Sequence, residues 1–247
     1  TTADVRAATS RLGSYTQIFK NAVIIPGTDE GLDKAGRAKE MAYQTLKIAK
    51  EQKLDIEKAL FANNAREAGS SVAARELAGL PSWIVTNIDQ AGDATAATGD
   101  GTDARTDGTA AAFDQARFDG VMQSIWEAGG KPDTVYLTAF QMNKALGFAG
   151  NNNQRSNITA EAEKVVKHMS VYVTPWGTVK FVPSREQRGS DVFVIQDDMF
   201  AVGVLRPTKN EALAKDGDYE KRQVITECCL IAKSEASSGA VYDCTVS

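Results

Sequence analysis

The stretch DEGLDKAGRAKEMAYQTLKIAKEQKLDIEKALFAN, residues 29–63, contains no proline and repeats its apolar residues every three or four positions. That spacing is typical of an amphipathic helix with one buried stripe. Thr28 or Asp29 can cap its first turn. At about 1.5 Å per residue the helix would be roughly 50 Å long, which predicts an elongated molecule built on a rod. The expected stripe consists of Leu32, Ala35, Ala42, Leu46, Ala49, Ile56 and Leu60.

The rest of the chain alternates helix-like and strand-like segments. Strand formers dominate residues 1–27 and end at Pro26-Gly27, so this segment is expected to be extended. A second helix is expected at 113–128, with Phe118, Val121, Met122, Ile125 and Trp126 on its buried side, and a third at 139–148. Residues 91–112 and 150–154 are loop-like in composition. Strands are expected at 135–137, 170–173, 178–182, 191–195, 201–205, 223–233 and 240–246.

Charge and cysteine content restrict the class of protein. The formal net charge is −4, so any contact with nucleic acid would have to be local. The three cysteines, Cys228, Cys229 and Cys244, lack a pairing pattern and are expected to be reduced and mostly buried. The single histidine, His168, leaves little material for a zinc site or a histidine-based triad. The chain has neither a membrane-length apolar run nor a signal-peptide pattern, and we expect no membrane partner.

Two acidic groups are the candidates for chemistry. The run Gly99–Asp103 with Asp107-Gly108 suggests a calcium loop, but no glutamate closes the twelve-residue frame of an EF-hand. Asp197-Asp198 lies between two expected strands, where adjacent acids usually form a solvated turn. We therefore predict no catalytic residue, no metal ligand and no cofactor. The residues alone indicate an elongated α/β protein whose extended ends need a partner.

The order of these features resembles the Hong-Kong-97-type fold of the major capsid proteins of tailed bacteriophages. Residues 11–28, RLGSYTQIFKNAVIIPGT, resemble the returning arm of that family's extended loop, and the helix at 29–63 resembles its spine helix. Leu77-Ala78-Gly79-Leu80 occupies the place of a small motif that often follows the spine helix. More specifically, the pattern Arg-x-Gly-x-Tyr-Thr-Gln-Ile-Phe at Arg11–Phe19 resembles one phage subfamily.

The resemblance implies an α+β capsid fold with a long spine helix, a peripheral domain and an axial domain. Residues 1–28 would be the returning part of the extended loop and 29–112 the peripheral domain. Residues 113–207 would be the axial domain, and 208–247 would return to the peripheral domain and end in a final strand. The strands within 170–206 would complete the axial sheet. The family's N-terminal arm and outgoing half-loop are missing before Thr1, so we expect a chain cut from a longer precursor or one that begins late.

By the same resemblance the chain is a structural shell protein and not an enzyme. It would form hexamers, pentamers and an icosahedral virion capsid in the host cytoplasm, containing DNA without sequence-specific binding. Scaffold, protease or decoration proteins are further expected partners. Some relatives crosslink a loop lysine to an asparagine near the turn before the long strand; Lys221-Arg222-Gln223 lacks that asparagine, so no such crosslink is expected. The residues expected at subunit interfaces are Arg11, Tyr15, Phe19, Asn152, Asn153, Asp216, Asp218, Lys221 and Arg222.

Two alternatives stay open from the sequence. One is the shell of a bacterial nanocompartment of the encapsulin kind, which shares the fold. The other is a small-molecule enzyme that uses Asp197, Asp198 or the Asp-rich loop.

Overall fold

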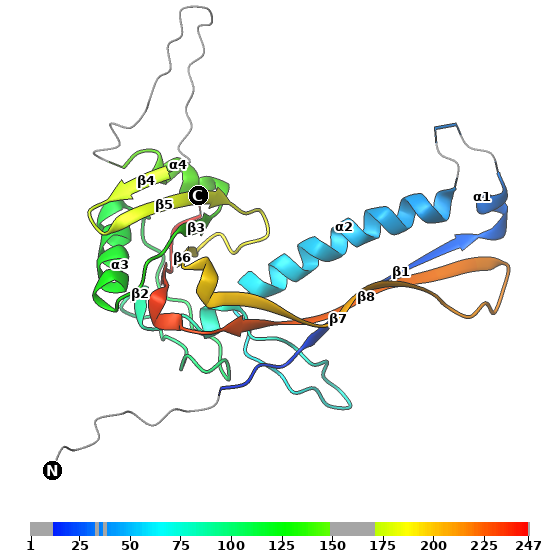
Figure 1. Ribbon diagram of the computed structural model, residues 1–247, viewed down its shortest axis with the longest axis horizontal. Coiled ribbons are helices and arrows are strands. Elements are labelled where there is room, and N and C mark those ends of the chain that lie inside the picture. The colour runs from blue at the N-terminus through cyan, green and yellow to red at the C-terminus, as the bar shows by residue number, and fades with distance from the viewer. Residues whose placement is uncertain (1–11, 33–34, 37–38, 149–170, 247) are drawn as a thin grey trace, which may run out of the picture.

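The computed structural model describes residues 12–32, 35–36, 39–148 and 171–246. It has two parts, a rounded lobe and an elongated extension that we call the stem (Figure 1). The stem consists of one long helix and three long strands. The lobe contains a six-stranded sheet and two helices. The expected combination of helices and strands in an elongated α+β molecule is therefore present.

The stem is a three-stranded antiparallel sheet with a helix along one face (Figure 1). Its strands are β1 (Gln17–Pro26), β8 (Tyr219–Ala232) and β7 (Phe200–Ala212), in the order β1-β8-β7. The helix is α2 (Glu40–Phe61). Side chains alternate along β1, so Phe19 and Val23 are buried while Ile18 and Ile24 are 43% and 55% exposed. One face of the sheet therefore carries the stem's core, and the other remains partly apolar and open.

The long helix expected at 29–63 is wrong at its N-terminal end. The structure has a short helix α1 (Gly27–Gly31), a break, and then α2, whose 22 residues span about 33 Å. Glycine is a poor helix former, and Gly36 adopts a φ of 85°, which ends any continuous helix there. The Glu30 carboxylate accepts a hydrogen bond from the backbone N–H of Met41 at 3.0 Å. A side chain from α1 thus satisfies a free N–H at the start of α2.

The buried stripe of α2 also differs from the expected one. Leu46 is 67% exposed and Ala42 is exposed, whereas Met41 and Gln52 are buried. The Gln52 amide donates to the backbone carbonyls of Phe19 and Val224 at 2.8 and 3.1 Å. Its oxygen accepts from the Thr226 hydroxyl at 3.1 Å. The spacing of the apolar residues does not predict this contact, because the residue at the centre of the buried stripe is polar.

The lobe is built on a mixed sheet with the order β2-β9-β6-β3-β5-β4. The pairs β2–β9 and β3–β5 are parallel, and the other neighbours are antiparallel. Two helices, α3 (Gln115–Glu127) and α4 (Ala139–Ala145), complete the lobe. An aromatic cluster fills its core, with Phe118 at 5.7 Å from Tyr172 and 5.8 Å from Phe181 between ring centroids. The strands are β2 (Asn87–Asp89), β3 (Thr134–Leu137), β4 (Val171–Thr174), β5 (Gly177–Pro183), β6 (Val192–Ile195) and β9 (Gly239–Val241).

Three expectations for the lobe are wrong. The strand at 201–205 is part of β7 and pairs in the stem, so it does not complete the lobe's sheet. The last strand stops at Val241, because Asp243 takes a φ of 55° that strands do not allow. Trp126, expected in the core, is 59% exposed. It lies at the last turn of α3 and lines a surface hollow of about 360 Å³ together with Lys131 and Trp176.

A shared hydrophobic cluster joins stem and lobe. Phe61 at the end of α2 lies 5.6 Å from Phe193 of β6 between ring centroids, and Leu230 of β8 belongs to the same cluster. Gly79 makes this junction tight, because a Cβ there would lie 1.8 Å from the carbonyl oxygen of Ala62. The Leu77–Leu80 segment is buried at this point. The stem and lobe are therefore packed as one unit.

No helix within the described residues is both long and apolar enough to cross a membrane. Short 3₁₀ turns lie at Leu80–Ser82, Asp197–Met199 and Glu235–Ser237.

Candidate subunit-contact surfaces

The segment leading into β1 is fastened to its own chain by alternate side chains. The Arg66 guanidinium lies 5.7 Å from the centre of the Tyr15 ring. The Gln17 oxygen accepts from the backbone N–H of Leu77 at 3.3 Å. Phe19 packs against Leu77 and Cys228 and is buried. Tyr15 is still 42% exposed, so of these residues it keeps surface for a neighbouring subunit, whereas Phe19 holds the strand in place.

Glu227 of β8 is the polar node beneath this segment. Its carboxylate accepts from the Thr16 hydroxyl at 2.6 Å and from Arg206 Nε at 2.7 Å. Arg75 lies 3.7 Å away. The hydrogen bond from the Thr16 hydroxyl lowers the pKa of this carboxyl, and the hydrogen bond and charge of Arg206 lower it further. These effects outweigh burial, which raises the pKa of a side chain that is only 5% exposed. Glu227 therefore stays ionised and ties three segments of the stem together.

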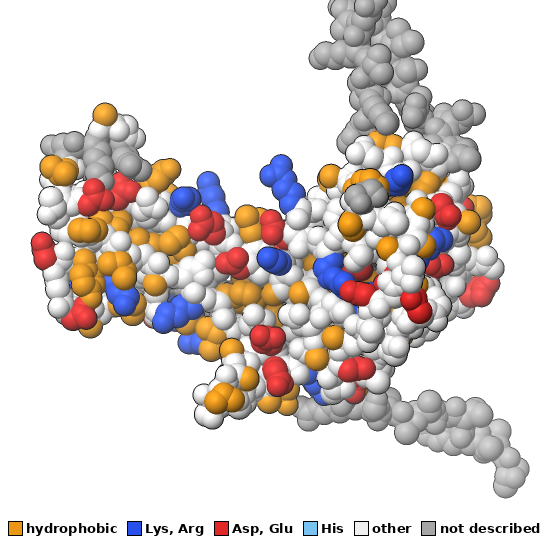
Figure 2. Space-filling view, turned by 180° about the vertical axis from the view of Figure 1, so that it is seen from behind, with side chains coloured by type: hydrophobic (Ala, Val, Ile, Leu, Met, Phe, Trp, Pro, Cys, Tyr) orange, Lys and Arg blue, Asp and Glu red, His pale blue; other side chains and the backbone are white. Residues whose placement is uncertain are grey.

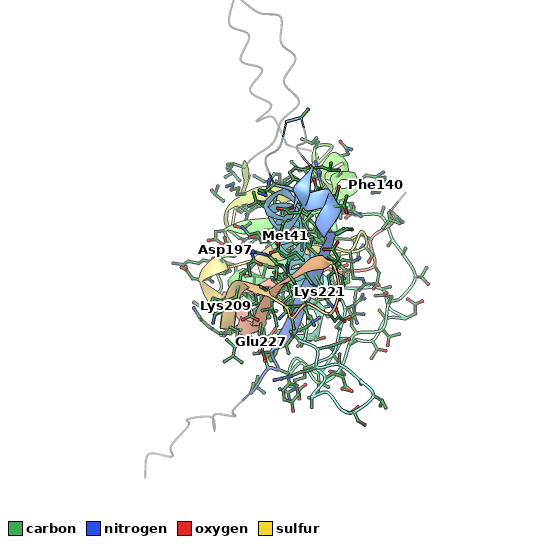
Figure 3. All side chains as sticks on the ribbon, turned by 90° about the vertical axis from the view of Figure 1, so that its right-hand side faces the viewer. Met41, Phe140, Asp197, Lys209, Lys221 and Glu227 are labelled. Atoms are coloured by element: carbon green, nitrogen blue, oxygen red, sulfur yellow. The ribbon has the colours of Figure 1, made fainter. Side chains whose placement is uncertain are left out.

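The connection between β7 and β8 forms the tip of the stem. Figure 3 looks along the stem from this end, with Lys221 and Met41 labelled. Asp216 and Asp218 are exposed, and Lys221 and Arg222 are half-buried. The Arg222 guanidinium pairs with Glu220 at 2.9 Å in the same chain. The tip thus presents two carboxylates to solvent, while one of the four residues expected to pair between subunits already has a partner.

The stem carries an unusually apolar open surface. Figure 2 shows apolar side chains spread over it among charged ones. Val202, Val204 and Leu205 on β7 are 47%, 56% and 63% exposed. Within the described residues β7 pairs only with β8, so its outer edge is free. Pro207 and two register shifts disrupt the far half of that edge, which leaves the half at 200–205 as the better template for a partner.

Three of the interface expectations, Arg11, Asn152 and Asn153, lie outside the described residues, as does His168. Cys228 and Cys244 are buried free thiols, and Cys229 is half-buried. Burial raises the pKa of all three, and that of Cys244 to about 12. These thiols are therefore protonated and packed, as expected from their sequence context.

The acidic candidates for chemistry have structural contacts. The Asp100 carboxylate accepts hydrogen bonds from the hydroxyls of Thr102 and Thr98 at 2.6 and 2.9 Å, and Thr102 lowers its pKa to about 2. Asp197 accepts from Thr134 at 2.8 Å. Among the residues the structure describes, no three His, Cys, Asp or Glu side chains are arranged to hold a metal ion. These carboxylates serve as caps for turns.

A buried ion network was missed from the sequence. The Arg105 guanidinium pairs with Asp243 at 2.7 Å and with Asp107, and it lies 4.2 Å from the centre of the Tyr242 ring. Arg188 pairs with Asp107 at 2.5 Å and lies 3.2 Å from Asp191. The residues of this network come from three distant segments, so no local sequence pattern predicts it.

Comparison with protein families matches residues 1–245 to the family described as SU10 major capsid protein. The chain belongs to this family. The major capsid protein of Escherichia phage Phieco32 is 24% identical over 264 residues, which cover 93% of this chain and 75% of that protein. The chain is therefore a structural shell protein of a phage capsid, and its family indicates a structural rather than an enzymatic role.

Solved structures show the same fold. The capsid of cyanophage A-1(L) matches with a TM-score of 0.66 at 11% identity, over 93% of this chain and 77% of that one. Microbacterium phage Oxtober96 matches with a TM-score of 0.60 at 11% identity, over 99% and 79%. The SrpI encapsulin of Synechococcus elongatus PCC 7942 matches with a TM-score of 0.58 at 9% identity, over 94% and 75%. The expected Hong-Kong-97-type fold is thus confirmed, and it is common to capsids and encapsulins.

Proposed function

We propose that this chain assembles through hexamers and pentamers into a closed icosahedral shell that encloses double-stranded DNA. The observation that carries the proposal is the stem, in a chain that belongs to a capsid family. Within the described part of the chain both outer strands of its sheet are open along one edge, and β7 exposes Val202, Val204 and Leu205. A second copy of the chain can cover such an edge and bury its apolar side chains.

The two parts of the molecule are assigned here to the two domains of the capsid fold. The stem, with α2 as its spine helix, would be the peripheral domain, and the lobe would be the axial domain near the capsomer centre. Residues 1–28 would belong to the extended loop. The boundaries expected at 112/113 and 207/208 do not coincide with the division between stem and lobe, because β2 lies in the lobe and β7 begins at Phe200 in the stem. The pairing of β9 with both β2 and β6 supports grouping 239–241 with the lobe.

The interface assignments rest on exposure. Asp216, Asp218 and Lys221 would meet their copies near three-fold axes, with Arg222 contributing only if it leaves Glu220. Tyr15 would contact a neighbour with its open side, and Phe19 would act by fixing the strand. We also assign contacts to Arg11, Asn152 and Asn153, on the resemblance alone.

The remaining parts of the proposal follow from the family. The shell would form in the host cytoplasm, with scaffold, protease or decoration proteins as partners and without sequence-specific DNA contacts. Tyr15, Thr16 and Gln17 contact Arg66, Glu227 and Leu77, which supports a structural role for the Arg11–Phe19 pattern. On that pattern we also propose that the chain belongs to the phage subfamily that carries it. Lys221-Arg222-Gln223 supports a shell without the lysine–asparagine crosslink.

Electron microscopy of the expressed chain tests the proposal, with a chain lacking residues 1–27 as the comparison. The chain should form closed shells, and the truncated chain should lose them while keeping a folded lobe, because β1 is one edge of the stem. Shells of normal size from the truncated chain would show that residues 1–27 are not needed for assembly, which would contradict this part of the proposal. Uniform monomers of the untruncated chain would reject self-assembly. Shells that enclose a cellular protein, and no DNA, would favour the encapsulin alternative.

A further inference from the structure

The ion network around Asp191 contains more negative than positive charge. It combines three carboxylates, Asp107, Asp191 and Asp243, with two guanidiniums, Arg105 and Arg188. The side chains of Asp191, Asp243 and Arg105 are 0%, 1% and 1% exposed. Asp107 and Arg188 are 49% and 27% exposed, so water screens these two charges at the rim of the network, whereas it reaches Asp191, Asp243 and Arg105 little.

Asp191 is the member with the weakest support. Its contact with Arg188 at 3.2 Å is not aligned as a hydrogen bond, and its Oδ2 atom has no hydrogen-bond partner. Arg188 makes its short contact, 2.5 Å, with Asp107 instead. Among the residues that the structure describes, only the Ser190 hydroxyl donates to the Asp191 carboxylate, at 2.9 Å. A buried carboxylate with so few donors gives up its proton less readily than an exposed one.

The same network fastens the loop at 90–112 to the lobe. Arg105 and Asp107 come from this loop, Arg188 and Asp191 from the turn before β6, and Asp243 from the segment after β9. Asp243 also accepts from the backbone N–H groups of Ala91 and Gly108, both at 3.1 Å. Backbone bonds run beside it, from Ala111 N–H to the Asp243 carbonyl at 2.8 Å. A change of charge at Asp191 therefore acts on the charged side chains that hold the loop on the lobe.

We propose that Asp191 is a proton-operated latch, which holds the 90–112 loop tightly on the lobe when protonated and loosens it when ionised. The groups that face it are Arg105, Asp107, Arg188, Tyr242, Asp243 and Cys244. Tyr242 and Cys244 stay neutral across the relevant range because burial raises the pKa of both. The pKa of Asp243 is lowered, so this residue stays ionised there. The raised pKa of Asp191 brings its own change of charge into mildly acidic solution.

The size of the effect follows from linkage. Burial raises the pKa of Asp191 to about 6 in the docked state. In the released state it would return to its ordinary value of about 3.9. Because the docked form binds the proton more tightly, docking strengthens as pH falls through 6. Between pH 7.5 and pH 5 the docking constant should rise about tenfold.

Amide hydrogen exchange of the unassembled chain tests the latch. The N–H of Ala111, which bonds to the Asp243 carbonyl at 2.8 Å, and that of Thr245, which bonds to the Ala111 carbonyl at 2.9 Å, report loop docking. After correction for intrinsic rates, both should be about tenfold better protected at pH 5 than at pH 7.5. Asp191→Asn should protect them similarly at both pH values, since the amide is neutral throughout. Asp198→Asn, which changes an exposed acid outside the network, should keep the wild-type dependence.

The chain has one histidine, His168, and histidines generally titrate in this range, so the comparison with Asp191→Asn isolates the part due to Asp191. An Asp191→Asn chain that keeps the full pH dependence, or a wild-type chain without any, would overturn the latch. Should the variant fail to fold, carbon-13 NMR of wild-type chain labelled at aspartate carboxyls decides the matter. One resonance should titrate near pH 6, and a set that titrates entirely below pH 5 would also overturn it.

Discussion

Replacing Gln52 with alanine should destabilise the subunit strongly, because this buried amide joins helix α2 to two strands of the stem. The side chain makes three hydrogen bonds, to the Phe19 and Val224 carbonyls and from the Thr226 hydroxyl. Each such bond contributes about 1 kcal/mol net to stability, so their loss costs about 3 kcal/mol. The space left by the side chain adds roughly 1 kcal/mol. Gln52→Ala should therefore lower the free energy of unfolding by about 4 kcal/mol.

The assay is thermal unfolding of the unassembled subunit, followed by circular dichroism. For a chain of this size, about 4 kcal/mol corresponds to a fall in Tm of roughly 8–16 °C. Gln123→Ala is the matched control, because Gln123 lies on the exposed side of α3 and its side chain donates to Glu127 of the same helix at 2.8 Å. That change should stay within about 0.5 kcal/mol. Equal Tm values for the two variants would refute the claim that Gln52 holds helix and sheet together.

Other changes probe the junction, the polar node and the stem tip. Gly79→Ala should destabilise the subunit by more than about 2 kcal/mol, because the new Cβ would overlap the Ala62 carbonyl. Gly120→Ala, in α3 with open space around it, should instead stabilise the subunit by about 0.5–1 kcal/mol. Urea unfolding measures both changes. Because the pKa of Glu227 is lowered in the folded chain, the stability it contributes is present above its ordinary pKa and declines as pH falls through the lowered one. Glu227→Gln should therefore destabilise at pH 7 and flatten stability between pH 5 and 3, and a variant with an unchanged acid profile would contradict this. Denaturing gels of assembled shells should show single chains, and covalent ladders would disprove the absence of a crosslink at Lys221–Gln223.

Local patterns predicted most elements of the lobe. Helix α3 and strands β4 and β5 lie close to their expected ranges because buried residues such as Phe118 and Val179 repeat with the period of their own element. Strands β3 and β6 also lie close to theirs, because each is a short, mostly buried run of strand-forming residues. The break before α2 was missed because Gly31 and Gly36 each weaken a helix only modestly. The Glu30 contact with Met41 that starts α2 depends on a chain reversal, which no local period encodes.

Contacts between distant segments account for the other differences. Strand β7 extends to Ala212 because it pairs with β8 along its length. The local sequence around 201–205 does not indicate that pairing. The ion network is invisible for the same reason: Arg105, Arg188 and Asp243 are separated by more than fifty residues at each step. Of the candidate contact residues, Tyr15 and Asp216 are exposed as an interface needs, whereas Phe19 serves its own subunit's core.

Buried polar contacts in the stem explain how one strand register is selected. Phe19 and Ile18 are both apolar, so moving β1 by one residue would exchange their faces at a limited hydrophobic cost. The same shift would separate Gln52 from the Phe19 carbonyl and Thr16 from Glu227, leaving buried polar groups unpaired at about 1–3 kcal/mol each. Apolar burial thus stabilises the stem, and polar groups decide its alignment. A shell built from many copies requires that uniformity, because each copy must present the same edge to its neighbour.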